Sequence, residues 1–382
     1  MSTLPAEAEI VIVGAGPTGL ALAAALRHLG VSSVLLLDAQ GEGANTSRAA
    51  VVHARTLEVL EPLGVTPALI AEGIRASSFF VRDRDKELVR FDFDGLPTPY
   101  PYVLLIPQNR TEAILLDRLR VLGGEVSRPR KVASLDIGTD GIDVHLEGGE
   151  KVRAQWVVGC DGMHSVVREQ AGIPFTGAAY EESFVLADAV LEGDFPPSLF
   201  LAPEGMLLLV PLPGGHHRVV ATQESAPPQP DLADIQALLD ARGPAAKPVR
   251  VREIRWSSRF RVHHRLAGAV RSGRVLLAGD AAHVHSPAGG QGMNTGLQDA
   301  VSLAEALRRA LREGDRDALE DWEKARRKVA RRVVQETDRL TRLATLRGPL
   351  ARRLRNMFLS LVGYLAPVRQ ALSFRMAELN NR

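Results

Sequence analysis

An apolar run that leads into a glycine loop, IVIVGAGPTGLALAAALRHLG (residues 10–30), constrains the fold of this chain more than any other feature. Residues 10–13 form a short apolar segment, typical of a parallel strand buried on both faces. A helical pattern starts at Pro17, and a second apolar segment at residues 34–37 ends at Asp38. Strand, helix and strand of this length form a βαβ unit. The sequence therefore predicts an α/β fold that begins with an enclosed parallel sheet.

The loop itself, Gly14-Ala15-Gly16-Pro17-Thr18-Gly19, has the spacing of a dinucleotide-binding turn. Gly14 permits the tight turn, Gly16 leaves room for a pyrophosphate, and Gly19 lets helix and strand approach each other. The amides and dipole at the helix start favour negative phosphates. Asp38 is suited to accept hydrogen bonds from a ribose diol. The alternative is a tight turn without a ligand, and the motif alone does not separate NAD from FAD.

Two later segments repeat the arrangement of an apolar strand followed by an acid. VVGCDGMHSVVR (157–168) contains Asp161, and GRVLLAGDAAHVHSPAGGQGMNTGLQDA (273–300) contains Asp280. Both acids are expected at the carboxyl ends of parallel strands, where ligands of open α/β sheets bind. Two acids at that edge suit a polyhydroxylated cofactor, and the ribitol chain of FAD is one.

Length and composition set the outer limits. The chain of 382 residues is long enough for two domains with apolar cores. Its 47 basic and 45 acidic residues give a formal charge of +2, which provides no general attraction to nucleic acid or to an acidic membrane. Cys160 is the only cysteine, so an internal disulfide is impossible, and a reducing cytoplasm fits best. The first residues lack the pattern of a secretory signal.

With the three motifs in this order and spacing, the chain resembles the single-component flavoprotein aromatic hydroxylases with the p-hydroxybenzoate hydroxylase fold, over nearly its whole length. The resemblance implies an α/β chain with a Rossmann-like FAD-binding domain, a sheet-rich substrate domain and a helical C-terminal region. The implied FAD-binding domain is discontinuous, over residues 1–72, 98–180 and 268–345. The substrate domain would take residues 73–97 and 181–267, and the helical tail residues 346–382.

The resemblance also implies which residues hold a non-covalent FAD. The glycine loop would bind the pyrophosphate and Asp38 the adenosine ribose, with Arg48 near the phosphates and Gln108 against the flavin. Asp161 would help bind FAD and, with Arg168, support the nicotinamide cofactor. The segment after the last strand would hold the ribitol and the isoalloxazine ring through Gly279, Asp280, Pro287, Gly290, Gly292, Met293 and Asn294. Independently, a glycine-rich loop that leads into a helix offers amides to an anionic reduced flavin. No catalytic residue and no metal site is assigned.

The implied reaction is hydroxylation of a phenolic or polycyclic aromatic substrate by O2 through a flavin hydroperoxide. NAD(P)H would be a transient co-substrate, because a second glycine fingerprint of comparable quality is absent. A flavin-dependent epoxidase, oxidase or halogenase, or a non-catalytic FAD-binding sensor, remain alternatives. The scattered Trp156, Trp256 and Trp322 lack the paired-tryptophan motif of a halogenase.

Several remaining features have a structural explanation that we prefer to a functional one. We expect His283 and His285 to serve packing or local hydrogen bonds. The same holds for the middle-domain cations His216, His217 and Arg218 and the run at 259–265, which we expect to be solvated rather than substrate contacts. The arginine-rich tail is expected to pack on its own domain or on a partner subunit. A homo-oligomer is therefore one of the expected states. A membrane-surface helix is the alternative, and no stable membrane attachment is expected.

Overall fold

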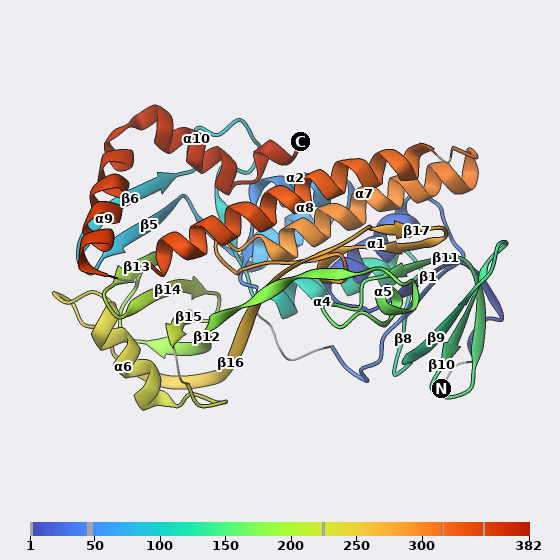
Figure 1. The fold of residues 1–382 in the computed structure, drawn as a ribbon, viewed down its shortest axis with the longest axis horizontal. Helices are drawn as coiled ribbons and strands as arrows, with labels where there is room; N and C mark the ends of the chain where they lie inside the picture. Colours follow the sequence, from blue (N-terminus) through green and yellow to red (C-terminus); the bar gives the residue numbers. More distant parts are fainter. Residues whose placement is uncertain (1–2, 44–48, 224–225, 316, 347) are drawn as a thin grey trace.

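The computed structural model describes residues 3–43, 49–223, 226–315, 317–346 and 348–382, and for 180–182 it describes the backbone alone. Figure 1 shows two sheet regions side by side, with the long helix α8 (Asp317–Ala344) extending from one to the other. The α/β class predicted from the first apolar run is confirmed by this arrangement.

The first sheet contains the predicted βαβ unit. Its strand order is β17-β18-β11-β1-β2-β8, and β10 and β9 extend it from β11 as an antiparallel meander. Four neighbours, β18, β11, β1 and β2, run parallel. The strands are β1 (Glu7–Val13), β2 (Val34–Leu37), β8 (Val126–Ser127), β9 (Val132–Ile137), β10 (Ile142–Leu146), β11 (Lys151–Gly159), β17 (Arg271–Ser272) and β18 (Val275–Leu277).

The second sheet is mostly antiparallel, in the order β19-β16-β12-β15-β14-β13-β5-β6. Two hairpins belong to this sheet, β5–β6 within residues 78–92 and β14–β15 around Pro213. The hairpin β5–β6 joins strands that lie more than a hundred residues later in the chain. The strands are β5 (Ser78–Asp83), β6 (Lys86–Asp92), β12 (Phe175–Leu191), β13 (Ser198–Ala202), β14 (Gly205–Leu212), β15 (His216–Gln223), β16 (Val251–Ala267) and β19 (His283–Val284).

Helices cover both sheets, and a small third sheet connects them. That sheet has the order β3-β7-β4, with β3 (Val51–Val52), β7 (Val103–Leu105) and β4 (Ile74–Ala76). No described helix is by itself long and apolar enough to cross a membrane. The other helices are α1 (Pro17–His28), α2 (Ala54–Leu60), α3 (Thr66–Glu72), α4 (Gln108–Val121), α5 (Val166–Gln170), α6 (Leu232–Arg242), α7 (Gly292–Arg312), α9 (Pro349–Tyr364), α10 (Ala366–Met376) and the short 3-10 helices η1 (Glu61–Leu63), η2 (Gly279–Ala281) and η3 (Leu379–Asn381).

The largest core lies between the parallel sheet and its helices. Residues 10–12 of β1 are fully buried, as their apolar sequence predicts. Helix α1 packs against α7 and α4, and its inner side is built from alanines and leucines. The small alanine side chains allow α1 to lie close to the sheet, which fixes the position of the glycine loop at its start.

Candidate functional site

The three sequence motifs meet at one edge of the parallel sheet. In the strand register, Leu37 pairs with Val13, Val13 with Gly159, and Gly159 with Leu277. These four residues therefore form one row across β2, β1, β11 and β18, and each motif begins immediately after its strand. The predicted convergence of the glycine loop, Asp161 and Asp280 on the carboxyl ends of parallel strands follows from this register.

The three glycines of the loop have different surroundings. A Cβ atom on Gly14, which has φ +100°, would lie 2.5 Å from the carbonyl oxygen of Cys160. A Cβ atom on Gly19 would lie 1.9 Å from the carbonyl oxygen of Gly14. In contrast, a Cβ atom on Gly16 would meet no heavy atom of the described residues within 4 Å. Gly14 and Gly19 are thus needed for packing, whereas Gly16 faces open space.

The start of α1 is open to a ligand. Its N-cap residue, Gly16, provides no side-chain cap for the first amides. Asp38 lies beside this helix end, where its Oδ2 accepts the N–H of Ala15 at 2.7 Å and its Oδ1 accepts the N–H of Gln40 at 2.8 Å. A carboxylate has about four acceptor sites, so capacity for a ribose hydroxyl remains.

Arg128 is a neighbour of this helix end that the sequence did not single out. Its Nη2 lies 3.8 Å from Asp38 Oδ2 and donates to the carbonyl oxygen of Ala15 at 3.3 Å. Arg128 also lines a hollow of about 450 Å³. The other lining residues come from the loop after β2 and from α4 and β8, namely Gly41, Glu42, Gly43, Leu116, Arg120, Glu125 and Val126. The two arginines of the lining are balanced by Glu42 and Glu125, and the position of the hollow beside Asp38 is suited to the adenosine end of a dinucleotide.

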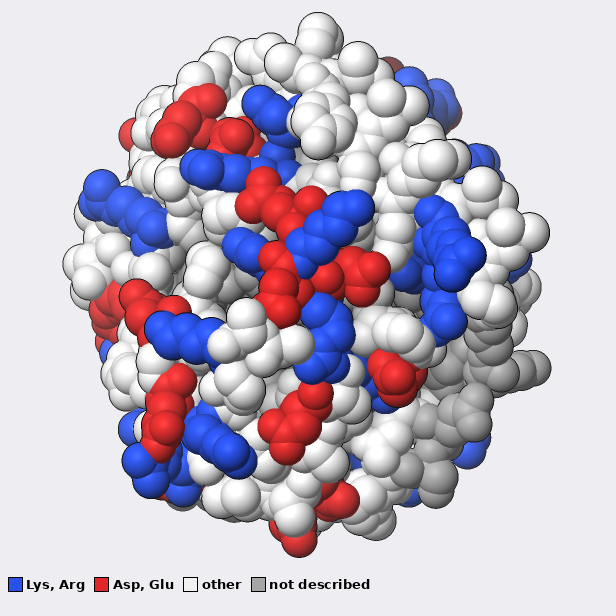
Figure 2. Space-filling model, turned by 90° about the vertical axis from the view of Figure 1, so that its left-hand side faces the viewer, with Lys and Arg blue, Asp and Glu red and all other residues white. Residues whose placement is uncertain are grey.

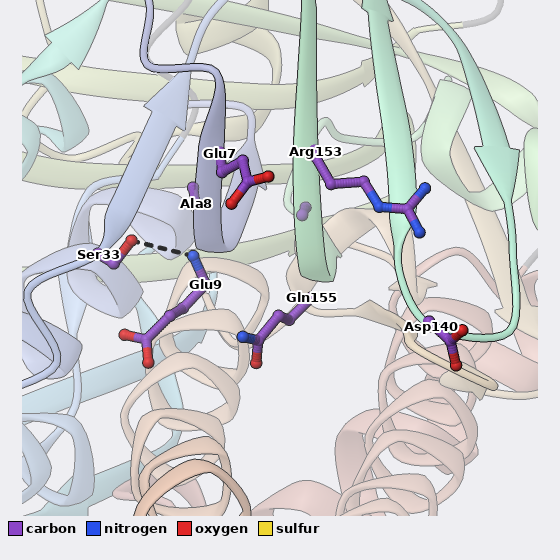
Figure 3. A pocket seen from close by; sticks show the side chains of 8 residues that line it. Glu7, Ala8, Glu9, Ser33, Asp140, Arg153 and Gln155 are labelled. Carbon is purple, nitrogen blue, oxygen red and sulfur yellow. Dashed lines mark hydrogen bonds between the residues drawn. The ribbon is translucent and has the colours of Figure 1, made fainter.

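A second hollow, of about 380 Å³, lies at the opposite edge of the same sheet. Figure 3 shows its lining by Glu7 and Glu9 at the start of β1, by Arg153 and Gln155 near the start of β11, and by Asp140 on a neighbouring turn. The lining residues of β1 and β11 lie at the amino ends of these strands, whereas the three motifs follow the carboxyl ends. This hollow is therefore separate from the site.

The second motif combines a buried acid with a buried arginine. Asp161 Oδ2 accepts the N–H of Val167 at 3.2 Å, while its Oδ1 is buried and has no hydrogen-bond partner among the described residues. Burial raises the pKa of Asp161 above its ordinary value. The guanidinium of Arg168 donates to the carbonyl oxygens of Ala281 at 2.9 Å and Met163 at 2.8 Å. Arg168 therefore ties the second motif to the third.

The third motif begins with Gly279, which packs on Thr18 of the first motif. The next residue, Asp280, is exposed at the start of η2. Pro287 is also exposed, and its carbonyl oxygen accepts the N–H of Gly290 at 2.9 Å. The turn leads directly into α7, whose N-cap residue Gln291 gives the helix no side-chain cap. An uncapped helix start that follows a glycine turn carries free amides and partial positive charge.

Asn294 holds this turn in place from its buried side. Its Oδ1 accepts the N–H of His53 at 2.9 Å, and its Nδ2 donates to the carbonyl oxygens of Val51 at 2.9 Å and Gly290 at 2.8 Å. Asn294 is fully buried, and Met293 packs against the main core. Asn294 therefore holds the backbone around the start of α7, while Gly290 and Gly292 form the surface of the turn.

Gln108, which the resemblance placed against the flavin, belongs to a part of the chain outside the three motifs. Gln108 begins α4, its Oε1 accepts the N–H of Ala49 at 3.2 Å, and its Nε2 donates to Glu112 at 2.8 Å. Burial raises the pKa of Glu112. Arg48 lies outside the described residues. Gln108 thus holds the backbone at Ala49, just before β3.

A buried charge cluster supports the third motif from inside. Asp299 on α7 lies 2.6 Å from Nε2 of His283 and accepts from Nε of Arg326 at 2.5 Å. Burial alone would raise the pKa of Asp299, but Arg326 and His283 outweigh burial and hold the pKa at about 2. Burial lowers the pKa of His285 to about 4. Packing and local hydrogen bonds therefore account for His283, and for His285 through its Nδ1 and the Ser286 carbonyl oxygen.

The expectation that Arg218 and His217 are solvated is wrong. Arg218 on β15 is only 2% exposed, and it forms two 2.8 Å hydrogen bonds with the carboxylate of Asp188 on β12. Its Nη1 donates to the carbonyl oxygen of Ala49 at 2.8 Å. His217 is also buried. The cation faces inward because cross-strand pairing supplies its carboxylate partner, so that Arg218 joins the second sheet to the loop beside Gln108.

These surroundings fit FAD. The two uncapped helix starts, at α1 and α7, provide donors for a pyrophosphate and for the flavin ring. The unpartnered Asp161 Oδ1 and the carboxylate of Asp38 provide acceptors for hydroxyl groups. Open space over Gly16 leaves room for the phosphates. A bound dinucleotide would thus satisfy polar groups that the described protein atoms leave without partners.

Comparisons with known proteins agree with this geometry. A family described as FAD binding domain matches residues 7–337. The chain is 39% identical to a 6-methylpretetramide 4-monooxygenase of Streptomyces rimosus, over 98% of this chain and 69% of the relative. It is 33% identical to a pentachlorophenol 4-monooxygenase of Sphingobium chlorophenolicum, over 88% of this chain and 66% of the relative. The chain therefore spans about two thirds of the length of these curated relatives.

Solved structures give the same result. A p-nitrophenol 4-monooxygenase from Pseudomonas putida superimposes with a TM-score of 0.89 at 28% identity, covering 99% of this chain and 100% of the other. An anhydrotetracycline hydroxylase from Streptomyces rimosus gives 0.82 at 33% identity, covering 98% of this chain and 76% of the other. From the converging motifs, the family match and these relatives, the chain belongs to the FAD-dependent aromatic hydroxylases with the p-hydroxybenzoate hydroxylase fold.

Proposed function

We propose that this chain hydroxylates a phenolic or polycyclic aromatic substrate, with FAD as its cofactor, O2 as the oxygen source and NAD(P)H as a transient reductant. The observation that carries the proposal is the meeting of two uncapped helix starts and two acids at one sheet edge. The relatives named above act on ring compounds such as pentachlorophenol and p-nitrophenol. A ring-hydroxylating role for this chain follows from both.

Different parts of FAD would be bound by residues that follow different strands of the row. Asp38 and Arg128 would bind the adenosine end, and the amides at Gly16 would bind the pyrophosphate. Asp280, exposed at η2, would hold the ribitol. The turn from Pro287 to Gly292 would lie against the flavin ring. Each role is supported by the position of these residues near the carboxyl edge of the sheet.

When bound, FAD supplies the hydride acceptance and the oxygen activation that side chains cannot supply. The chain's own contribution is electrostatic and steric. The amides at the start of α7 favour negative charge on the ring, because the helix dipole is positive there. Asn294 keeps these amides in place through its three hydrogen bonds. Preorganised donors of this kind do not reorganise during the reaction, which is how they lower a barrier.

The second sheet would provide the substrate side. We propose that residues 73–97 and 181–267 bind the aromatic ring and exclude water, while residues 1–72, 98–180 and 268–345 hold FAD. Arg218 supports this division, because its contacts with Asp188 and Ala49 hold the second sheet against the loop that precedes β3. NAD(P)H would approach the flavin without a binding domain of its own, with Asp161 and Arg168 nearby. The single cysteine, Cys160, agrees with a cytoplasmic location.

The test is turnover by the purified, FAD-loaded protein. We expect NADH or NADPH oxidation to accelerate when a panel of phenols and polycyclic aromatics is added, and we expect the product to carry one oxygen atom from O2. Tight FAD binding without any substrate-stimulated turnover would instead support a non-catalytic FAD-binding protein. Oxidation with release of all the oxygen as hydrogen peroxide across the whole panel would support an oxidase.

A further inference from the structure

One helix near the C-terminus turns an apolar face to solvent. The α9 outer face consists of large apolar side chains that are 40% to 86% exposed. Those within α9 recur at intervals of three and four residues, so they share one side of that helix, and the remaining two follow at the bend and in α10. The members are Leu350, Leu354, Met357, Phe358, Leu361, Tyr364, Leu365 and Val368.

The opposite side of α9 holds the helix on the protein and is the more polar of the two. Arg355 is buried and donates to the carbonyl oxygens of Ala344 at 3.2 Å and Leu201 at 3.3 Å. Asn356 Nδ2 donates to Asp83 at 2.7 Å. Val362 on the same side is buried and packs with Leu359 in a hydrophobic core cluster. Most of the large apolar side chains of α9 nevertheless face outward, whereas a surface helix usually turns its apolar side inward. The tail, which was expected to pack on its own domain or on a partner subunit, has this outer face left uncovered by the described part of the chain.

The α9 outer face is larger than the apolar patches that monomeric proteins usually expose to solvent. From the exposed fractions, its side chains present on the order of 900 Å² to solvent, against about 300–600 Å² for the largest apolar patch of a typical monomer. Such a patch marks an interaction site with a protein or a membrane. Because Arg355 and Asn356 hold the inner side on the protein, the outer face of α9 is free to bind another molecule or a membrane without detaching the helix.

The charge around the α9 outer face favours a membrane over a protein as its binding partner. From Arg339 to Ala377 the sequence contains no aspartate or glutamate, and every charged residue is an arginine. Figure 2, which looks at the side where α9 lies, shows mixed charges over the middle and a broad uncharged area toward the upper right, bordered by basic residues. A second copy would oppose arginines to arginines, which is unfavourable, whereas anionic phospholipid is complementary.

We propose that the α9 outer face docks on the surface of an anionic phospholipid bilayer, with α9 lying in the plane of the interface. A helix with leucine and phenylalanine on one side, beside the exposed Arg353 and the half-buried Arg352, is suited to this binding mode. The helices α9 and α10 together are apolar enough to span a membrane, but they are bent by 99° and are anchored on the second sheet. Docking on the surface needs no rearrangement of either helix.

The experiment is sedimentation of the FAD-loaded full chain with vesicles of phosphatidylcholine alone or mixed with phosphatidylglycerol. We expect binding to the mixed vesicles that weakens as salt is raised. The variant Met357→Gln/Phe358→Gln/Leu361→Gln should lower the partition coefficient at least about 100-fold, since each buried side chain accounts for roughly tenfold. Arg353→Gln should lower it about fivefold, and only for the mixed vesicles. The matched control is Val121→Gln, which removes an equally exposed apolar residue from α4 and should change nothing.

Oligomeric state is measured on the same samples by sedimentation velocity. A wild type that ignores both vesicles and is a dimer, with a monomeric triple variant, would overturn the proposal in favour of a second copy. A monomer that ignores both vesicles would overturn it as well, as would equal binding by the triple variant. Vesicle binding is read without turnover, so these outcomes are distinct from any failure of the proposed hydroxylation.

Discussion

Thr18 Oγ1 lies 2.5 Å from the position that a Cβ atom would occupy on Gly279, and it lies equally close to that position on Gly296. Thr18 follows β1, Gly279 follows β18, and Gly296 belongs to the first turns of α7. The first and third motifs are therefore in direct contact through one hydroxyl group. Glycine at position 279 is required both by this contact and by its φ of +62°.

Replacing Gly279 with alanine should destabilise the protein by about 2–4 kcal/mol, because overlap with Thr18 adds to left-handed backbone strain. The control is Gly273→Ala at the other end of β18. Gly273 has φ +56°, but within the described part of the chain its Cβ atom would meet nothing inside 4 Å. That control should therefore lose only about 1 kcal/mol. Urea unfolding of the FAD-free proteins measures both, and equal losses would show that the Thr18 contact is unimportant.

Arg218 should be one of the most sensitive charged positions of the second sheet. Arg218→Met leaves the Asp188 carboxylate without its partner in the interior, which costs about 3–5 kcal/mol of unfolding free energy. The comparison is Arg342→Met, which breaks a 2.9 Å pair with Asp338 whose arginine is 73% exposed. That change should cost less than about 1 kcal/mol. Similar losses at the two sites, measured by chemical denaturation, would contradict the buried role of Arg218.

Glu378 should make stability fall as pH rises. It is fully buried beside Gln298, and burial raises its pKa from 4.5 to about 8. Between these two values the folded protein binds a proton that the unfolded chain releases, so the free energy of unfolding decreases with pH. Glu378→Gln should flatten this slope and add on the order of 3 kcal/mol near pH 8. Denaturation midpoints from pH 5 to pH 8 measure it, with the exposed Asp94→Asn as the control that keeps the slope.

Much of the fold was predictable because local patterns carry it. The apolar run before Gly14 predicted a buried parallel strand, and β1 is that strand. The start of α7 was less predictable. Its glycine-rich sequence has low helix propensity, yet the helix begins at Gly292, because Asn294 fastens this segment to His53 and Val51.

The cofactor edge was predictable only in outline. Motifs place Asp38, Asp161 and Asp280 after strands, and the strand order then brings them together. The sequence carries no signal for Arg128, since its partners Asp38 and Ala15 lie far away in the chain. The same is true of Arg218 with Asp188 and of Glu378 with Gln298. Such pairs depend on strand register and helix docking, which local patterns do not encode.

The central claim is that three separate loops build one FAD site at this edge of the sheet. Gly16 tests it because no described heavy atom lies within 4 Å of its Cβ position, so a valine there adds bulk over the predicted pyrophosphate position. Gly16→Val should therefore leave the thermal stability of the FAD-free protein unchanged.

The decisive measurement is the dissociation constant of FAD, obtained from quenching of flavin fluorescence, for the wild type and for Gly16→Val. We expect the variant to bind FAD at least about 100-fold more weakly, because the loop amides no longer reach the phosphates. Equal affinity of the two proteins for FAD, with both folded, would contradict the site.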